Sequence, residues 1–207
     1  MKVIKPSVEI LQPLPYDYFL DLIEFAGRTC YQSEDKIEDG SAEKFVRGLI
    51  RRGHESVLEH GNITVKFICD RGVSHEIVRH RIAAYSQEST RYCNYSNGKF
   101  GNEITVIDPC FWPHCDVKYH EWYSEMEEAE MSYLQLISSG ATPQEARSVL
   151  PNSLKTALVM TANIREWRHF LKLRTSPAAH PQIREVAIML LNQFKKKYPV
   201  FFEDIEV

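Results

Sequence analysis

The run KYHEWYSEMEEAEMSYLQLIS, residues 118–138, decides the fold class of this 207-residue chain. Its apolar side chains recur at steps of three and four residues, at Tyr119, Trp122, Met126, Ala129, Tyr133 and Leu136. This spacing is typical of a long amphipathic helix, whose acidic residues form the outer face. Because such long helices accompany only a few short strands, the chain is expected to fold as an α+β domain.

The rest of the chain divides into shorter segments whose apolar periods and end signals predict helices or strands. Helices are expected over 16–30, 42–52, 74–84, 143–151, 154–173 and 183–198. Strands are expected over 7–11, 62–69 and 103–107, and a polar loop over 85–101. We therefore predict a single domain with long helices and a small, mostly antiparallel sheet.

Composition excludes several classes of protein. The hydrophobic fraction is 43% and the charged fraction 26%, which excludes disorder, collagen and coiled coil as descriptions of the whole chain. No run approaches about 18 apolar residues, and the start MKVIKPSVEI lacks a secretory signature. Five cysteines without a CxxC pair indicate reduced thiols. We expect a cytoplasmic protein that does not bind a membrane.

Charge is unevenly distributed along the chain. The net charge of −3 argues against a general nucleic-acid binder. Residues 163–184, however, contain a single acidic residue, Glu166, and five basic residues, namely Arg165, Arg168, Lys172, Arg174 and Arg184. A mildly acidic protein with such an arginine-rich segment suits small anionic ligands better than a long phosphate backbone.

The strongest local signal is Arg-His-Arg at 79–81, followed by Ser89. If 74–84 is helical, Glu76 shares a face with the first residues of this motif. Two guanidinium groups within one turn repel each other, and an anion between them relieves that repulsion. The alternative is a solvated helix face with Glu76 and Glu88 as counter-ions.

A second signal is a basic stripe, Arg165, Arg168, His169 and Lys172, at helical spacing. Its pattern is also that of the exposed face of an amphipathic helix, and this interpretation is the stronger one. Arg174 differs from the stripe because it lies where the helix is expected to end. An arginine at such a position is freer to enter a pocket.

The segment HESVLEH, residues 54–60, resembles a zinc-protease motif but lacks the second histidine four positions after the first. Glu55 and Glu59, four residues apart, are suited to hold the hydroxyls of a sugar or ribityl chain. The alternative is a polar helix start packed near Gly61. Cysteines and histidines between 110 and 120 match no standard zinc spacing either, so no metal is expected.

Six blocks of sequence agree with one known family: HESxxEH at 54–60, Arg-His-Arg-x7-Ser at 79–89, SxRY at 89–92, Ala-Arg at 146–147 with Leu-Pro at 150–151, NxRxWxHF at 163–170 with the arginine at 174, and AHPQIR at 179–184. Through them, residues 50–190 resemble the flavin-dependent thymidylate synthases. The resemblance implies one catalytic domain, 1–207, that methylates dUMP to dTMP without an enzyme nucleophile. It implies 5,10-methylenetetrahydrofolate as carbon donor, FAD reduced by NADPH as hydride source, and a homotetramer with shared active sites.

The resemblance also implies roles for individual residues. Arg174 is the catalytic residue, which activates dUMP by favouring ionisation at N3 of the uracil. The dUMP site comprises Glu76, Arg79, Gln87, Glu88, Ser89, Arg91, Arg147 and Arg174. The FAD site comprises Ser56, Arg79, His80, Arg81, Gln87, Asn163, Arg165 and His169. Two departures affect the contacts at 76 and 87: Glu76 stands where Gln also occurs, and Ser86-Gln87 replaces a frequent Asn-Glu pair.

Two other functions remain open from the sequence. A nucleic-acid-binding domain using Arg79, Arg81 and Arg91 predicts strongly salt-dependent binding, but the net charge and the lack of a recognised module count against it. The second alternative is a non-catalytic relative of this family that still binds a nucleotide in the same pocket. The presence of Arg174 argues against this alternative. We therefore expect the partners to be dUMP and folate, with no nucleic acid.

Overall fold

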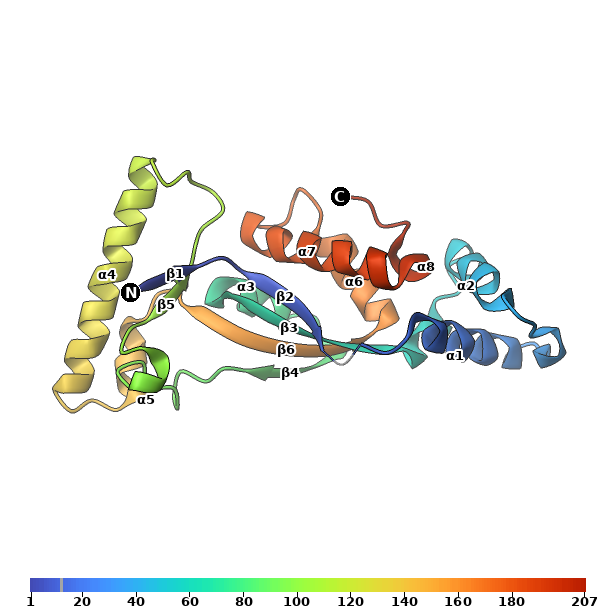
Figure 1. The fold of residues 1–207 in the computed structure, drawn as a ribbon, viewed down its shortest axis with the longest axis horizontal. Helices are drawn as coiled ribbons and strands as arrows, with labels where there is room; N and C mark the ends of the chain where they lie inside the picture. The colour runs from blue at the N-terminus through green and yellow to red at the C-terminus, as the bar shows by residue number, and fades with distance from the viewer. Residues whose placement is uncertain (12) are drawn as a thin grey trace. The chain divides into compact units, whose positions relative to one another are not determined.

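The computed structural model describes residues 1–11 and 13–207 and confirms the α+β class (Figure 1). A four-stranded sheet has the order β2 (Ser7–Leu11), β3 (Asn62–Asp70), β6 (Lys155–Asn163) and β4 (Ala83–Gln87). A second sheet pairs β1 (Lys2–Ile4) in parallel with β5 (Thr105–Ile107), so that Lys2 lies opposite Thr105. None of the helices within the described residues is both long and apolar enough to cross a bilayer.

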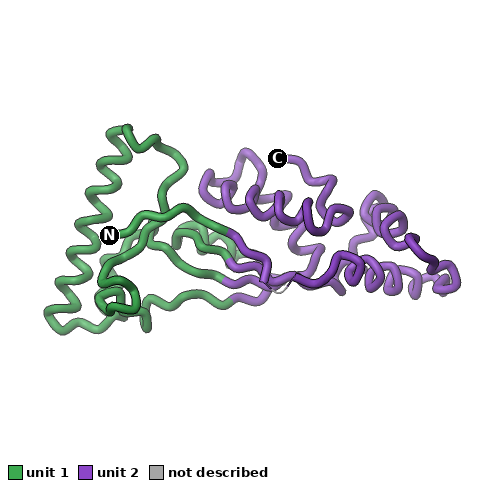
Figure 2. The backbone as a smooth tube through the Cα atoms, in the orientation of Figure 1, with its two compact units in different colours: residues 1–7, 67–79, 86–158 green, residues 8–66, 80–85, 159–207 purple. Residues whose placement is uncertain are grey.

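The chain separates into two compact units, which Figure 2 shows in different colours. Unit 1 comprises residues 1–7, 67–79 and 86–158, and unit 2 comprises residues 8–66, 80–85 and 159–207. The boundary between them passes through every strand of the four-stranded sheet. That residues 1–207 act as one catalytic domain stays a prediction.

Unit 1 is built around α4 (Val117–Ser138), the helix that the opening run predicted. The Asp116 carboxylate caps its first turn by accepting the Lys118 N–H at 2.9 Å. Met126 and Tyr133 pack into an apolar cluster with side chains of β1 and β5 and of the loop before β5. Unit 1 also contains α3 (Arg71–Ile77) and η3 (Gly98–Phe100), which precede α4 in the chain, and α5 (Pro143–Ala146) and η4 (Arg147–Val149), which follow it.

Unit 2 holds most of the helices. They are α1 (Tyr16–Thr29), η1 (Glu34–Lys36), α2 (Ser41–Arg51), η2 (Ser56–His60), α6 (Ile164–Arg174), α7 (Pro181–Lys197) and α8 (Pro199–Phe202). α6 packs against η2, α7 and α8. The core is aromatic: the Phe194 ring lies 5.6 Å from the Trp167 ring and 4.6 Å from the Phe202 ring.

The expected helix over 154–173 is wrong in its first half. Residues 155–163 form strand β6, and only residues 164–174 are helical. In β6 the buried residues alternate strictly, at Thr156, Leu158, Met160 and Ala162. This period of two is that of a strand, and the helical spacing of Met160 and Ile164 arose by coincidence.

The expected helix over 74–84 is also wrong. α3 begins earlier, where the Asp70 carboxylate accepts the Val73 N–H at 2.8 Å, and ends at Ile77. Ser74 is inside this helix rather than at its cap, and its hydroxyl donates to the Arg71 carbonyl. Arg-His-Arg at 79–81 therefore lies in the connection between α3 and β4, so the proposed helical face of this motif does not exist.

The aromatic core gives a prediction for stability. Phe194 is fully buried, and Phe194→Ala is expected to lower the free energy of unfolding by about 3–5 kcal/mol, because the surrounding rings cannot collapse into the space. Urea unfolding followed by tryptophan fluorescence measures it. Phe25→Ala is the matched control, since Phe25 is 57% exposed and its loss is expected to change stability by less than about 0.5 kcal/mol. Equal effects of the two substitutions would contradict the proposed core.

Candidate active site

The residues predicted to bind dUMP lie in unit 1, except Arg174. Several of them gather just after β4. The Glu88 carboxylate accepts the Tyr95 hydroxyl at 3.0 Å and the Lys155 ammonium at 2.5 Å. Its N–H continues the strand pairing by donating to the Ala157 carbonyl at 2.8 Å. Glu88 is therefore a positioned, internally paired anion.

The loop that follows Glu88 brings Ser89, Arg91 and Arg147 into one neighbourhood. The Ser89 hydroxyl accepts the Arg91 N–H at 3.3 Å, and the Ser89 carbonyl accepts the Cys93 N–H at 3.0 Å. Arg147, at the start of η4, donates to the hydroxyl of buried Thr90 at 3.4 Å. The turn after β4 thus carries the Ser89 hydroxyl and Arg91, and Arg147 reaches the same turn from η4 through Thr90. A hydroxyl and guanidinium groups are donors suited to phosphate.

Gln87 has a structural role that its prediction as a ligand residue did not include. Its amide nitrogen donates to the Ser74 hydroxyl at 2.9 Å and to the Thr156 hydroxyl at 3.3 Å. These bonds tie the end of β4 to α3 and β6 within unit 1. The remaining predicted residues of this unit lie at and just after the end of α3, with Glu76 half-buried and Arg79 exposed.

The residues predicted to bind FAD lie in unit 2, except Arg79 and Gln87. A cavity of about 470 Å³ in this unit is lined by Glu55, Glu59, Ile82, Asn163, Arg165, Glu166, Arg168, His169 and Lys172. It contains three of the predicted FAD residues, the whole basic stripe of α6, and both glutamates of the 54–60 segment. A neighbouring hollow of about 350 Å³ contains Ser56, whereas Arg81 is exposed in the connection before β4.

The basic stripe is in part the solvated face that its spacing favoured, because Arg165, His169 and Lys172 are exposed, but Arg168 is buried. Arg168 is 2% exposed and forms a bidentate ion pair with Asp204, with both distances 2.7 Å. It also donates to the Phe201 carbonyl and, at 3.3 Å, to Glu55. Arg165 pairs with Glu59 at 2.6 Å while both side chains remain about half exposed. The stripe therefore forms one wall of the cavity, and carboxylates balance part of its charge.

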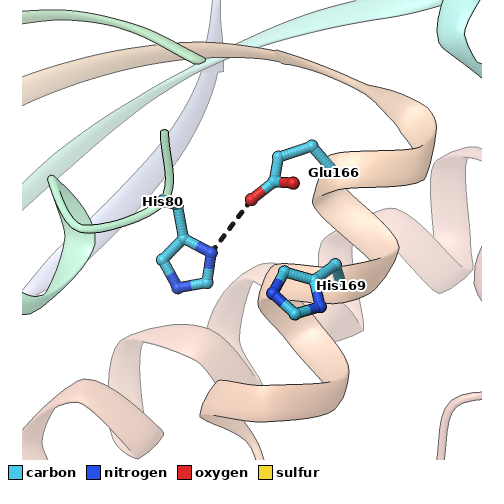
Figure 3. A group of neighbouring side chains, drawn as sticks. All are labelled: His80, Glu166 and His169. Carbon is cyan, nitrogen blue, oxygen red and sulfur yellow. Dashed lines mark hydrogen bonds and ion pairs between the residues drawn. The ribbon is translucent and has the colours of Figure 1, made fainter. Parts of the chain in front are cut away.

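Beside this cavity, His80 links two residues of α6, as Figure 3 shows for one of them. Its Nδ1 lies 3.0 Å from a Glu166 carboxylate oxygen, and its Nε2 lies 3.1 Å from Nε of Arg174. The imidazole is 5% exposed and packs edge-on against Phe170. Burial lowers the pKa of His80; the Glu166 carboxylate raises it and Arg174 lowers it again, with a net lowering. The ring is therefore neutral at neutral pH.

The ligand atoms of His80, Glu166 and His169 lie within 4.8 Å of one another, a grouping that resembles a metal site. Both nitrogens of His80 are already hydrogen-bonded, one of them to a guanidinium. A cation placed there loses an imidazole ligand and meets a positive charge. The geometry therefore favours a hydrogen-bonded chain over a metal centre at this position.

Comparison with known proteins identifies the family. A family model described as thymidylate synthase complementing protein matches residues 17–200. The chain is 34% identical over 187 residues to the flavin-dependent thymidylate synthase of Pyrococcus furiosus, which covers 90% of this chain and 76% of that protein. The chain belongs to the flavin-dependent thymidylate synthase family. The enzyme of that name from Mycobacterium tuberculosis is 34% identical over 204 residues, covering 90% and 79% of the two chains.

A solved structure agrees with this family assignment. The chain superimposes with a TM-score of 0.79 and 25% identity on a UMP/dUMP methylase, PolB from Streptomyces cacaoi, bound with 5-Br dUMP. The match covers 98% of this chain and 96% of that one. The family resemblance drawn from the sequence blocks is confirmed. The sequence assigns Glu166 and Arg168 no role at the site, and the structure identifies them because both are charged side chains buried on α6.

The ion pair between Arg168 and Asp204 predicts a pH-dependent stability. The guanidinium holds the pKa of the Asp204 carboxyl below its ordinary value. The ionised Asp204 carboxylate therefore makes its full contribution to the free energy of unfolding above the unfolded pKa of about 3.9. This contribution is lost as the pH falls through the lower pKa of the folded state. Asp204→Asn is expected to cost about 1 kcal/mol at neutral pH, because water replaces part of the lost contact.

Urea unfolding at neutral pH and at about pH 3 measures the difference in free energy of unfolding between wild type and Asp204→Asn. Glu203→Gln is the matched control, because Glu203 is the adjacent residue and pairs with Arg47 at the surface. The difference between wild type and Asp204→Asn is expected to shrink at acidic pH. A difference that is the same at both pH values would show that ionisation of Asp204 does not stabilise the fold.

Proposed function

We propose that this chain methylates dUMP to dTMP, taking the carbon from 5,10-methylenetetrahydrofolate. Membership of the flavin-dependent thymidylate synthase family supports the general reaction. The observation that carries the proposal is the cavity of unit 2, in which Asn163, Arg165 and His169 lie together with Lys172. The sequence blocks of the family specify five of its lining residues, namely Glu55, Glu59, Asn163, Arg165 and His169.

The donor set of this cavity fits FAD. Arg165 and Lys172 are cations suited to a pyrophosphate, and His169 and Asn163 add further polar groups. Glu55 and Glu59 on the same lining are acceptors for the hydroxyls of a ribityl chain. When bound, FAD reduced by NADPH supplies the hydride of the reaction. The role of the residues is to bind and orient it.

We assign the dUMP phosphate to the turn that carries Ser89 and Arg91, together with Arg147, which contacts Thr90 of this turn from η4. Arg174 is the catalytic residue: its guanidinium stabilises the negative charge that develops when N3 of the uracil loses its proton. An N3 anion makes C5 of the uracil a better nucleophile. No cysteine is required to attack the base, and all five cysteines are free thiols in the structure.

The assembly is also part of the proposal. We infer a cytoplasmic homotetramer in which each active site takes residues from several copies, as the family resemblance implies. The predicted dUMP residues belong almost entirely to unit 1 and the predicted FAD residues almost entirely to unit 2, a separation that is compatible with shared sites. Sedimentation equilibrium of the purified protein tests the tetramer directly.

Flavin binding is the first test. The purified protein is expected to take up FAD, and the visible flavin absorption is expected to bleach with NADPH and dUMP in the absence of air. Arg165→Ala should raise the Kd for FAD about tenfold, the effect of losing one charge-assisted hydrogen bond. Arg47→Ala, which removes a surface arginine paired with Glu43 and Glu203, is the control and should leave the Kd unchanged. Failure of the wild type to take up flavin would refute the proposal.

The role of Arg174 is tested separately. Arg174→Ala is expected to lower kcat for dTMP formation by about 100- to 1000-fold, because the charge that develops in the transition state loses its preorganised donor. FAD content and thermal stability, measured on the same preparation, are expected to stay near wild type. Arg51→Ala, at the exposed end of α2, is the control. Unchanged dTMP formation by Arg174→Ala would remove the assigned role.

A further inference from the structure

Three side chains of unit 2, those of Glu166, His80 and Arg174, are joined by consecutive hydrogen bonds. The Glu166 carboxylate contacts Nδ1 of His80 at 3.0 Å, and Nε2 of the same ring contacts Nε of Arg174 at 3.1 Å. His80 and Glu166 are both buried, and Arg174 is half-buried. Neither Glu166 nor this use of His80 belongs to the roles that the family resemblance implied.

The chain is built along one face of α6. Glu166, Phe170 and Arg174 follow one another at intervals of four residues, so they lie within about 80° of each other around the helix. The His80 ring lies along this face, with its two nitrogens bonded to the first and last of the three and its edge against Phe170. Figure 3 shows the His80 ring turned toward Glu166, with His169 on the next turn.

The protonation of the chain follows from its chemistry. An arginine side chain only donates hydrogen bonds, so Nε2 of His80 must be the unprotonated acceptor. The ring proton is then on Nδ1, from which it donates to the Glu166 carboxylate. The lowered pKa of the buried ring agrees with this neutral form. A carboxylate, a neutral imidazole and a guanidinium thus stand in a fixed order.

We propose that Glu166 and His80 are positioning residues that hold the Arg174 guanidinium ready for the uracil. The inference rests on the proposed function, because it is the role of Arg174 there that makes its orientation matter. An arginine side chain has many rotamers, and fixing one of them before the substrate arrives removes an ordering cost from the transition state. Glu166 acts on Arg174 through His80, by setting which ring nitrogen accepts.

The backbone supports both positioning residues. The Asn163 side chain accepts the Glu166 N–H at 2.8 Å, which fixes Glu166 in the first turn of α6. The Tyr85 hydroxyl donates to the His80 carbonyl, which anchors the connection that carries the ring. These contacts explain why the ring is held although it lies outside any helix or strand.

The geometry implies an acidic limit to activity. The titratable or charged groups that face His80 are Glu166, His169 and Arg174 from α6, and Tyr85 from β4. Protonation of Nε2 replaces the acceptor by a donor and sets two positive charges against each other, so Arg174 is released. Because the Glu166 carboxylate raises the pKa of His80, Glu166→Gln is expected to shift the acid limb of kcat to lower pH.

The first experiment does not depend on activity. Nitrogen-15 NMR of the intact protein, labelled at histidine and arginine and free of substrates, reports the tautomer of His80 and the N–H signal of Arg174 at Nε. At neutral pH we expect a protonated Nδ1, an unprotonated Nε2 and a slowly exchanging Nε–H of Arg174. Glu166→Gln should speed that exchange about tenfold or more, as expected for loss of one charge-assisted hydrogen bond. An Nε2-protonated ring in the wild type would overturn the inference.

The second experiment uses kinetics. His80→Phe keeps ring volume without nitrogens and is expected to lower kcat about tenfold or more. His80→Gln restores an acceptor near the position of Nε2 and should regain part of that loss. FAD content and melting temperature are measured for each variant, and Glu203→Gln, a surface carboxylate, is the control that should keep wild-type kcat. Equal losses in His80→Phe and His80→Gln would overturn the positioning role.

Combining the substitutions separates the two proposals. In an Arg174→Ala background, His80→Phe is expected to cause no further loss of kcat, since the group that it positions is already absent. A further tenfold loss there would overturn the inference while leaving the role of Arg174 intact. If Arg174→Ala itself keeps wild-type kcat, the proposed role of Arg174 fails, and the NMR experiment still decides whether His80 and Glu166 hold it.

Discussion

The hydrogen bond from the Glu166 N–H to the Asn163 side chain, 2.8 Å long, is the constraint on which the site of unit 2 depends. Asn163 is both the last residue of β6 and the N-cap of α6, so this bond fixes where the strand stops and the helix starts. Every basic residue of the stripe, and Arg174 after it, is placed by the resulting helical register. A shift of one residue would turn the whole set by about 100°.

Charge in unit 2 is organised by pairing rather than by accumulation. Arg168 spans Glu55, Asp204 and the Phe201 carbonyl while almost fully buried, and so connects the segment before η2 to the end of the chain after α8. A buried guanidinium is tolerated only because each of its nitrogens has an acceptor. The basic residues of 163–184 therefore have two roles. Arg168 links separate segments of the chain, and it also lines the cavity together with Arg165 and Lys172.

The elements that could be predicted from the sequence are those with one clear period. α4, α1, α2 and α7 follow helical spacing, and β2 and β3 follow extended or alternating patterns, so each was predicted to within a few residues. β6 was missed because Met160 and Ile164 fit both periods, and only burial of alternate residues separates them. The short β1 was not predicted, because three residues carry too little pattern.

The candidate site was predictable only in part. The family blocks placed Arg165, His169 and Asn163 together, and the structure gathers them on one cavity. The contact of His80 with Arg174 joins residues 94 positions apart, and no periodicity encodes such a distance. The sequence shows Glu166 only as the single acidic residue of a basic segment. In the structure, Glu166 lies in the first turn of α6 and contacts His80.

The pairing of Arg165 with Glu59 has a consequence for selectivity. The cavity already contains an anion of its own, held at 2.6 Å by the cation that a ligand would use. Any incoming anion must compete with this resident counter-ion, and a singly charged one such as chloride or acetate gains little by replacing it. Because a ligand with several phosphate oxygens would engage Arg165 and Lys172 together, we expect Glu59 to favour multiply charged anions over singly charged ones at this cavity.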